Sequence, residues 1–266
     1  TYLFIILLLL GLQMTNSILS LYWVFFIDDN NQLWALFQDG RLSLMKQVPP
    51  FASFSSDHTL ITGVEIDGKS TAIKWMYADF QKKEFPPIIS CSGYCYFPAL
   101  LNKVHSQLAL IQADLLNPAG TGKMLVYQKA RKKYHLVDTF QAAMYPPFYG
   151  NSGSLYYISP KGDLEKKTID EIKLVHPQVS LFALSETEED IAVYSGETIR
   201  WISPKTGHFR QFIAFDVTAI GFNQAADTLF FATHKNGRTG LYQYNKHNQE
   251  ITLILNHPAK ITAISF

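Results

Sequence analysis

Apolar and polar residues alternate in short runs along almost the whole chain. From Tyr22 onward, apolar runs are separated by polar turns rich in Lys, Asn, Asp and Gly. Alternation with a period of two is typical of β-strands, and these turn residues are typical of hairpins. No convincing helical period follows residue 21. The pattern therefore predicts an all-β chain.

The alternating pattern also repeats along the chain. Five segments read as a strand, a polar turn and a second strand, and their second strands begin at Leu60, Leu108, Leu155, Ile191 and Leu229. These starts are 48, 47, 36 and 38 residues apart. A further hairpin follows in each unit, as in TIRWISPKTGHFRQF from Thr198. Units of this length with four antiparallel strands indicate a propeller.

The two ends of the chain complete one unit. ITAISF at Ile261–Phe266 matches the first strand VTAIGF at Val217, and YWVFFI, QLWALF and RLSLMKQV near the start supply the other three strands. We therefore predict a six-bladed β-propeller of four-stranded antiparallel blades, closed by the C-terminal strand joining the N-terminal strands. The alternatives are an open β-sandwich and a seven-bladed or unclosed array. The predicted blades begin near Pro49, Pro98, Pro147, Val179, Val217 and Ile261.

Two segments carry a family resemblance. PFASFSSDHTLI at Pro50–Ile61 is similar to the repeat of TolB-like propellers, which runs proline, aromatic, serine, an Asp-Gly turn and an apolar strand. Ile27–Val48 resembles the second part of that repeat. The resemblance covers residues 22–266 as an architecture, with degenerate turns such as NSGS at 151–154. It implies an exported binding or scaffolding protein, or a propeller domain of the kind attached to peptidases.

The first segment of the chain is strongly apolar. Residues 1–27 contain no charged side chain, and the first Lys or Arg is Arg41. An apolar core followed by small and polar residues is typical of a signal peptide, whereas Thr1–Leu21 also approaches the length of a spanning anchor. A buried core segment is the third interpretation. We predict a signal peptide or membrane anchor at residues 1–20 and a propeller domain at 21–266.

Composition narrows the function classes. The net charge is +1 and hydrophobic residues make 47% of the chain, which argues against disorder and against nucleic-acid binding. Two cysteines exclude a four-cysteine zinc site, and the eight histidines show no metal-ligand spacing. We expect no metal and no cofactor.

Two short motifs resemble catalytic or phosphate-binding segments. GNSGS at Gly150–Ser154 resembles a serine-protease nucleophile segment, and AGTGK at Ala119–Lys123 resembles half of a phosphate loop. GNSGS falls where every other unit has its first turn, and Met124 stands where a phosphate loop needs Ser or Thr. We interpret both as turns, and the catalytic residues stay unknown.

Cys91 and Cys95 flank SGY in a predicted loop between two blades. In an oxidising compartment they would form a small-loop disulfide, and in a reducing one they would be free thiols. The basic run from Lys129 to His135 predicts a solvated strand edge, with a polyanion-binding patch as the alternative. We predict binding at the longest insertions, 86–97 and 115–123, and at the channel mouth.

The sequence favours an exported, non-catalytic propeller that acts as a protein-binding or scaffolding module, in a periplasmic or secreted location. It would be a monomer or part of a hetero-complex, and would touch a membrane only through residues 1–20 if these are uncleaved. One alternative is a propeller enzyme of lyase, lactonase or glycan-hydrolase type, with its site at the central channel mouth. Another is a membrane-anchored subunit of an envelope complex. A scaffold should expose an apolar patch on a face or rim, and an enzyme a polar cluster with perturbed ionisation.

Overall fold

A computed structural model gives the architecture. It describes residues 22–50, 52–55, 60–67, 70–77, 89–92, 95–101, 106–112, 121–128, 130–141 and 147–265. The proposed signal or anchor segment, residues 1–20, lies outside these ranges. In the described ranges no helix is long and apolar enough to cross a membrane.

The described elements are all β-strands, and they form six four-stranded antiparallel sheets. The all-β class and the four-stranded antiparallel blades predicted from the repeat are thereby confirmed. The sheet built from both chain ends has the order β24 (Ile261–Ser265), β1 (Tyr22–Asp28), β2 (Gln32–Phe37) and β3 (Leu42–Gln47).

The other five sheets follow one another along the chain. The first consists of β4 (Ser53–Phe54), β5 (Leu60–Asp67), β6 (Ser70–Tyr77) and β7 (Ile89–Ser92). The second consists of β8 (Cys95–Leu101), β9 (Gln107–Gln112), β10 (Thr121–Gln128) and β11 (Lys133–Gln141). The third consists of β12 (Phe148–Tyr149), β13 (Leu155–Ile158), β14 (Leu164–Lys167) and β15 (Ile172–His176).

The last two sheets have the same sequential order. One consists of β16 (Leu181–Leu184), β17 (Ile191–Ser195), β18 (Thr198–Ser203) and β19 (His208–Ile213). The other consists of β20 (Val217–Phe222), β21 (Thr228–Lys235), β22 (Arg238–Asn245) and β23 (Ile251–His257). In each of the five sheets, sequential strands are neighbours, so each sheet is a meander.

Turn chemistry fixes where the strands of the first hairpins end. Between β1 and β2, Asn31 adopts φ 58° and its N–H donates to the Asp28 carbonyl. Between β2 and β3, Gly40 adopts φ 82° and its N–H donates to the Phe37 carbonyl. Asn and Gly tolerate this left-handed conformation, so the DDNN and DG segments close the hairpins at the predicted places.

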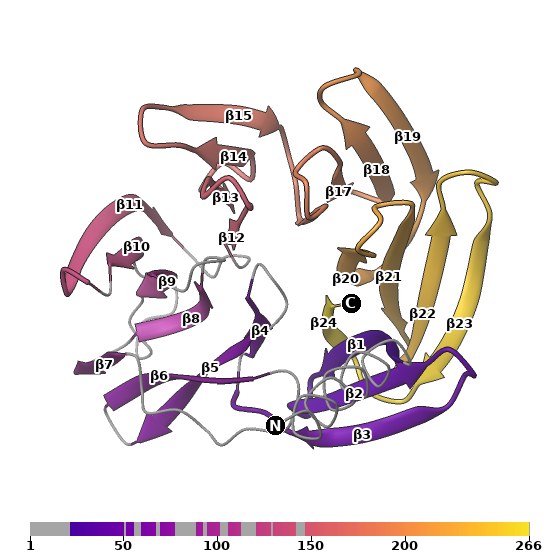
Figure 1. Cartoon of the computed structure of the whole chain (residues 1–266), viewed down its shortest axis with the longest axis horizontal. Coiled ribbons are helices and arrows are strands. Elements are labelled where there is room, and N and C mark those ends of the chain that lie inside the picture. The colour runs from indigo at the N-terminus through magenta and orange to yellow at the C-terminus, as the bar shows by residue number, and fades with distance from the viewer. Residues whose placement is uncertain are drawn as a thin grey trace, which may run out of the picture.

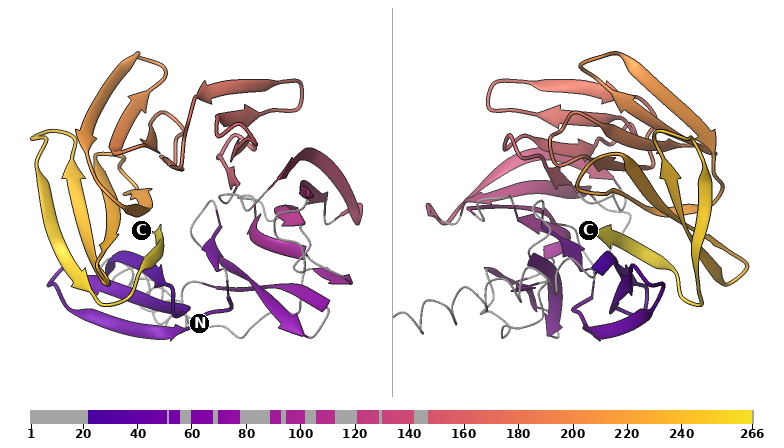
Figure 2. Two further views of the ribbon diagram at one scale, coloured as in Figure 1. Left: turned by 180° about the vertical axis from the view of Figure 1, so that it is seen from behind. Right: turned by 45° about the vertical axis from the view of Figure 1, so that its right-hand side comes forward.

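The sheets are arranged around a common centre. Strands β4, β12, β20 and β24 lie toward the middle, whereas β3, β11, β15, β19 and β23 lie at the periphery (Figures 1 and 2). Because each sheet runs from the middle outward, its fourth strand is an edge at the rim of the molecule.

The core lies between the faces of neighbouring sheets. One apolar cluster joins the β16–β19 sheet to the β20–β23 sheet and includes Trp201, Phe222 and Phe231. A second joins the β20–β23 sheet to the sheet of both chain ends and includes Phe230 and Ile264. Further apolar clusters link the other pairs of neighbouring sheets, with one exception. The β4–β7 and β8–β11 sheets meet through contacts of β5 with β8. Burial of apolar side chains between neighbouring sheets holds the sheets of a propeller together.

A buried carboxylate joins the two ends of the chain. Asp28 ends β1 with only 1% of its surface exposed, and its side chain accepts four hydrogen bonds. The donors are the backbone N–H groups of Asn30 and Gln32, at 3.0 and 2.9 Å, Trp34 Nε1 at 2.9 Å and His257 Nε2 at 3.2 Å. The carboxylate is therefore fully satisfied, as a buried charge must be.

Main-chain bonds reinforce this junction. Strand β24 pairs with β1 from Phe25↔Ser265 to Asp28↔Ile261. The Asp29 N–H donates to the Lys260 carbonyl at 2.8 Å, and the Thr262 hydroxyl donates to the Ile27 carbonyl at 3.1 Å. One sheet thus depends on residues from both ends of the chain.

Replacing Asp28 by Ala should lower the free energy of unfolding by about 3–5 kcal/mol, because the Trp34 and His257 N–H groups stay buried without their acceptor. Urea unfolding followed by Trp fluorescence measures the change. Asp170→Ala, in an exposed turn, is the control and should change the free energy by less than about 0.5 kcal/mol. Equal effects of the two substitutions would contradict the role of Asp28.

Candidate functional site

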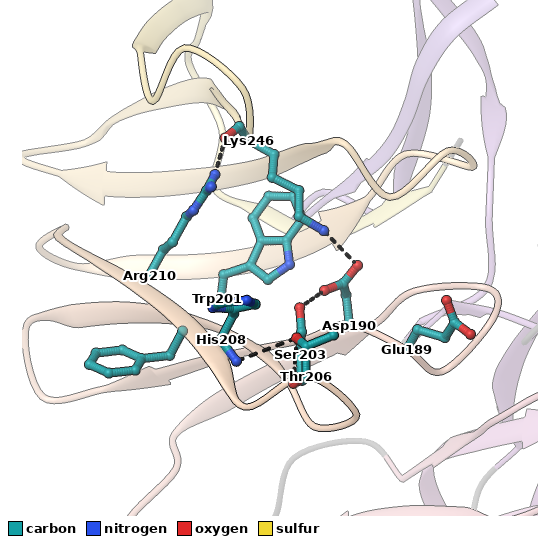
Figure 3. A pocket seen from close by; sticks show the side chains of 9 residues that line it. Glu189, Asp190, Trp201, Ser203, Thr206, His208, Arg210 and Lys246 are labelled. Carbon is teal, nitrogen blue, oxygen red and sulfur yellow. Dashed lines mark hydrogen bonds and ion pairs between the residues drawn. The ribbon is translucent and has the colours of Figure 1, made fainter.

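A cleft of about 370 Å³ opens beside the junction of the β16–β19 and β20–β23 sheets (Figure 3). The turn before β17 contributes carboxylates, β18 and β19 form one wall, and the turn after β22 contributes an ammonium group. The lining residues are Glu189, Asp190, Trp201, Ser203, Thr206, His208, Phe209, Arg210 and Lys246.

Asp190 is the most strongly held group in this cleft. The Ser203 hydroxyl donates to its Oδ1, and Lys246 Nζ lies 3.0 Å from its Oδ2. The Lys246 Nζ also lies 5.0 Å from the centre of the Trp201 ring, a cation–π distance. Asp190 therefore bridges two neighbouring sheets.

The ionisation of Asp190 follows from these contacts. Burial is the largest influence and alone would raise the pKa of Asp190. The hydrogen bond from Ser203 and the contact with the Lys246 ammonium group act in the opposite direction, and the pKa is lowered from its ordinary value. A general base works best with a pKa near the working pH, so this carboxylate is tuned toward a permanent ion pair rather than toward proton transfer.

A second buried carboxylate, Glu188, joins the β12–β15 and β16–β19 sheets. Ser152 donates to it from its backbone N–H, at 2.5 Å, and from its hydroxyl, at 3.0 Å. The Tyr156 hydroxyl donates at 2.9 Å, and Lys166 Nζ lies 3.4 Å away. Gly150 leaves room for this carboxylate, because a Cβ there would overlap it and the Glu188 side chain would have to move. Only 8% of the Glu188 side chain is exposed.

The pKa of Glu188 is also lowered. Burial is the largest influence and raises the pKa, but the donors on Ser152 and Tyr156 and the charge of Lys166 together outweigh it. Glu188 and Asp190 thus each link two neighbouring sheets, and their oxygens already accept hydrogen bonds. We call these two carboxylates braces.

The exposed large apolar side chains have a different location. Nine of the eleven in the described residues lie on the fourth, outermost strands of five sheets: Leu44, Tyr134, Leu136, Ile172, Leu174, Phe209, Ile213, Ile251 and Leu253. The other two, Ile169 and Phe215, lie in loops beside β15 and β19. These residues were not predicted from the sequence, although the place of each fourth strand in the repeat marks it as a sheet edge.

The turn interpretation of GNSGS is confirmed. Residues 150–154 connect β12 to β13, and the Ser152 hydroxyl bonds with Glu188 and Ser154 rather than with a histidine base. The basic run is exposed at Arg131–Lys133 and His135, at the start of the edge strand β11, where a solvated strand edge was expected. Lys129 lies outside the described residues.

Two predicted insertions are shorter than expected. The segment 86–97 was taken as a loop, but it contains all of β7 and the start of β8; the segment 115–123 contains the start of β10. In both, strand pairing overrides the small and polar residues that favoured loops. Cys91 lies in β7 and Cys95 in β8, and their disulfide stays a prediction.

No three His, Cys, Asp or Glu side chains in the described ranges lie together as a metal site would require.

The fold and these surfaces define the chain as a β-propeller of four-stranded blades. Solved structures with the same architecture include TolB from Acinetobacter baumannii, with a TM-score of 0.70 and 12% identity over 91% of this chain and 66% of that chain. This chain thus spans about two thirds of the length of that TolB. The TolB-like resemblance inferred from the repeat is confirmed at the level of the fold.

Other propellers are also similar in fold. A chain in the nidogen/laminin complex gives a TM-score of 0.63 at 10% identity, covering 91% of this chain and 96% of that one. An oligogalacturonate lyase in complex with manganese gives 0.54 at 12% identity, covering 82% and 72%. No family model and no curated protein sequence matches the chain. Because binding proteins and an enzyme share the fold, function has to be argued from the surfaces of this chain.

Substituting Glu188 by Gln should lower the free energy of unfolding at pH 7 by roughly 1–3 kcal/mol, because the charge that Lys166 and three donors stabilise is lost. The folded pKa lies below the ordinary 4.5, so this difference should be constant well above pH 4.5. It should shrink as the pH falls through the folded pKa. Urea unfolding from pH 7 to pH 3 measures it.

Glu189→Gln is the matched control for Glu188→Gln. The Glu189 side chain is 54% exposed and pairs with Lys205 at the surface. Its loss should change the free energy of unfolding by less than about 1 kcal/mol, because surface pairs contribute little. A pH-independent difference for Glu188→Gln would contradict the proposed brace.

Proposed function

We propose that this chain is a non-catalytic propeller that binds a protein partner through its outer rim. The observation that carries the proposal is the concentration of exposed apolar side chains on the outermost strands. On four of these strands two exposed apolar side chains share one face, as Phe209 and Ile213 do on β19, and apolar area left exposed in patches is typical of interaction sites. Glu188 and Asp190, whose pKa values are lowered, are by contrast occupied in contacts between sheets.

The proposal includes a single closed ring. We infer that the six sheets are six blades, with the sheet of both chain ends as the closing blade. The pairing of β24 with β1, the Asp28–His257 contact and the apolar clusters between sheets support this inference. A closed ring holds the rim strands at fixed mutual positions, which suits a scaffold that presents several edges.

The proposal also places the mature protein outside the cytoplasm. Residues 1–20 would direct export or anchor the chain, and residues 21–266 would form the propeller. Support comes from the uncharged apolar segment at the start of the chain and from the two closely spaced cysteines. Partners would then be extracytoplasmic proteins.

Photo-crosslinking tests the rim as a binding surface. A photoreactive phenylalanine analogue is placed at Leu44, Leu174, Phe209 or Leu253 in the natively produced protein. At least one position should give a discrete adduct with one partner protein. The exposed turn residues Lys205 and Asn236 are the controls and should give none. Adducts from the turns alone would overturn the rim assignment.

Intact mass of the natively produced, non-reduced protein tests export. About the first 20 residues should be absent if the segment is a cleaved signal peptide of ordinary length. Both thiols should resist alkylation until reductant is added, because Cys91 and Cys95 would be bridged. Two freely alkylated thiols would contradict an oxidising location.

A further inference from the structure

The outermost strands differ in how regularly they pair with the rest of their sheets. Register shifts interrupt the pairing of β3, β11, β15 and β23 with their inner neighbours. Strand β19 instead pairs with β18 in six consecutive steps, from Thr198↔Ile213 to Ser203↔His208, with no shift. Strand β7 also has no shift, but it pairs over only four residues. Irregular edges resist the addition of another strand, so β19 is the long regular edge in the described part of the chain.

The face of β19 is also unusually apolar for an edge. Phe209 is 65% exposed and Ile213 is 69% exposed, the highest values among the outer-strand apolar residues whose side chains the structure describes. They share one face with Gln211, because side chains of a strand alternate. On the other face, Phe212 packs on Phe231 and Tyr244. One face of β19 therefore stabilises the fold and the other faces solvent.

Strands β18 and β19 themselves carry charge of one sign, whereas the exposed carboxylates Glu197 and Asp216 lie beyond the Ile213 end of β19. Strands β18 and β19 contain Arg200 and Arg210 and no Asp or Glu. The nearby carboxylates Glu189 and Asp190 are paired with Lys205 and Lys246. Arg210 lies on the face opposite Phe209, and one of its N–H groups donates to the Lys246 carbonyl. A guanidinium has five N–H donors, so others remain for a ligand.

We propose that β19 receives an extended segment of a partner protein as a fifth strand of its sheet, and that this segment alternates apolar and acidic residues. The inference rests on the proposed protein-binding function. Backbone hydrogen bonds to the regular edge would provide affinity, as in other cases of strand addition. The apolar side chains of the incoming strand would cover Phe209 and Ile213, and its carboxylates would pair with Arg210 on the opposite face.

A second copy of this chain is the competing occupant, and charge argues against it. Two β19 strands paired with their apolar faces on the same side would bring their two Arg210 side chains onto one face, which is destabilising. An acidic segment has the complementary charge. The oligomeric state is therefore one outcome of the test.

The test uses a display library of random twelve-residue peptides selected on the full chain. Enriched peptides should alternate Val, Ile or Phe with Asp or Glu. Their affinity, measured by fluorescence anisotropy, should fall about tenfold or more on the double variant Phe209→Ser, Ile213→Ser. Arg210→Gln should weaken acidic peptides and reduce the salt dependence of binding. Ile172→Ser, Leu174→Ser on the rim strand β15 is the matched control and should bind as the wild type does.

Backbone methylation of an enriched peptide tests strand addition directly. An added strand pairs through every second residue, so methylating one alternate set of amide nitrogens should abolish binding and methylating the other set should not. Circular dichroism and urea unfolding show that each variant is folded. A β19 variant that no longer folds is replaced by Gln211→Pro, which blocks the same edge.

Three results would overturn the proposal. Peptides that bind the β19 variant unchanged, or that tolerate both methylation sets, would exclude strand addition at β19 while leaving protein binding elsewhere on the rim intact. Dimers that depend on Phe209 and Ile213 would replace the acidic partner by a second copy. Failure of the proposed function itself is distinguishable, because it would appear as the absence of crosslinks from every rim position.

Discussion

The fold depends on one buried carboxylate that both ends of the chain need. Asp28 accepts hydrogen bonds from its own turn, from Trp34 and from His257, which is 229 residues away. Because a carboxylate only accepts, the Nε2 atom of His257 must carry the proton, and the ring is fixed edge-on between Phe26 and Trp34. Without these donors the charge could not be buried, and without the charge β24 would lose its polar anchor beside β1.

Buried carboxylates that accept several hydrogen bonds also link later sheets of the propeller. Glu188 and Asp190 are two residues apart, yet they reach to opposite neighbours, one toward Ser152 and Lys166 and the other toward Lys246. Each spans a junction that also holds an apolar cluster, so each links two sheets at a fixed position as well as contributing stability. Because these acceptors are already engaged, the proposed binding function is assigned to apolar side chains that the fold leaves exposed, most of which lie on the outer strands.

Much of the architecture could be predicted because the inner strands are buried on both faces. Strands β13 and β17 begin at Leu155 and Ile191, where their apolar runs begin in the sequence. Strand β7 was missed because ISCS lacks a long apolar run, and the cysteine segment was taken as a loop. The braces could not be predicted, because local spacing cannot reveal a contact such as Asp28–His257, and Glu188 resembles any acidic turn residue.

Folding alone does not explain the exposed apolar side chains on the outer strands. Phe212 is explained by its stacking on Tyr244, with ring centres 4.5 Å apart. Phe209 and Ile213, on the other face of the same strand, remain more than 60% exposed, so they add little to the stability of the isolated chain. An apolar residue on a regular, unbulged edge favours association with another strand, a property that folded proteins ordinarily suppress with charges or bulges. The basic edge of β11 and the shifted registers of β3, β15 and β23 follow that rule, and β19 departs from it. A partner strand on β19 would bury these side chains and saturate the open backbone edge together.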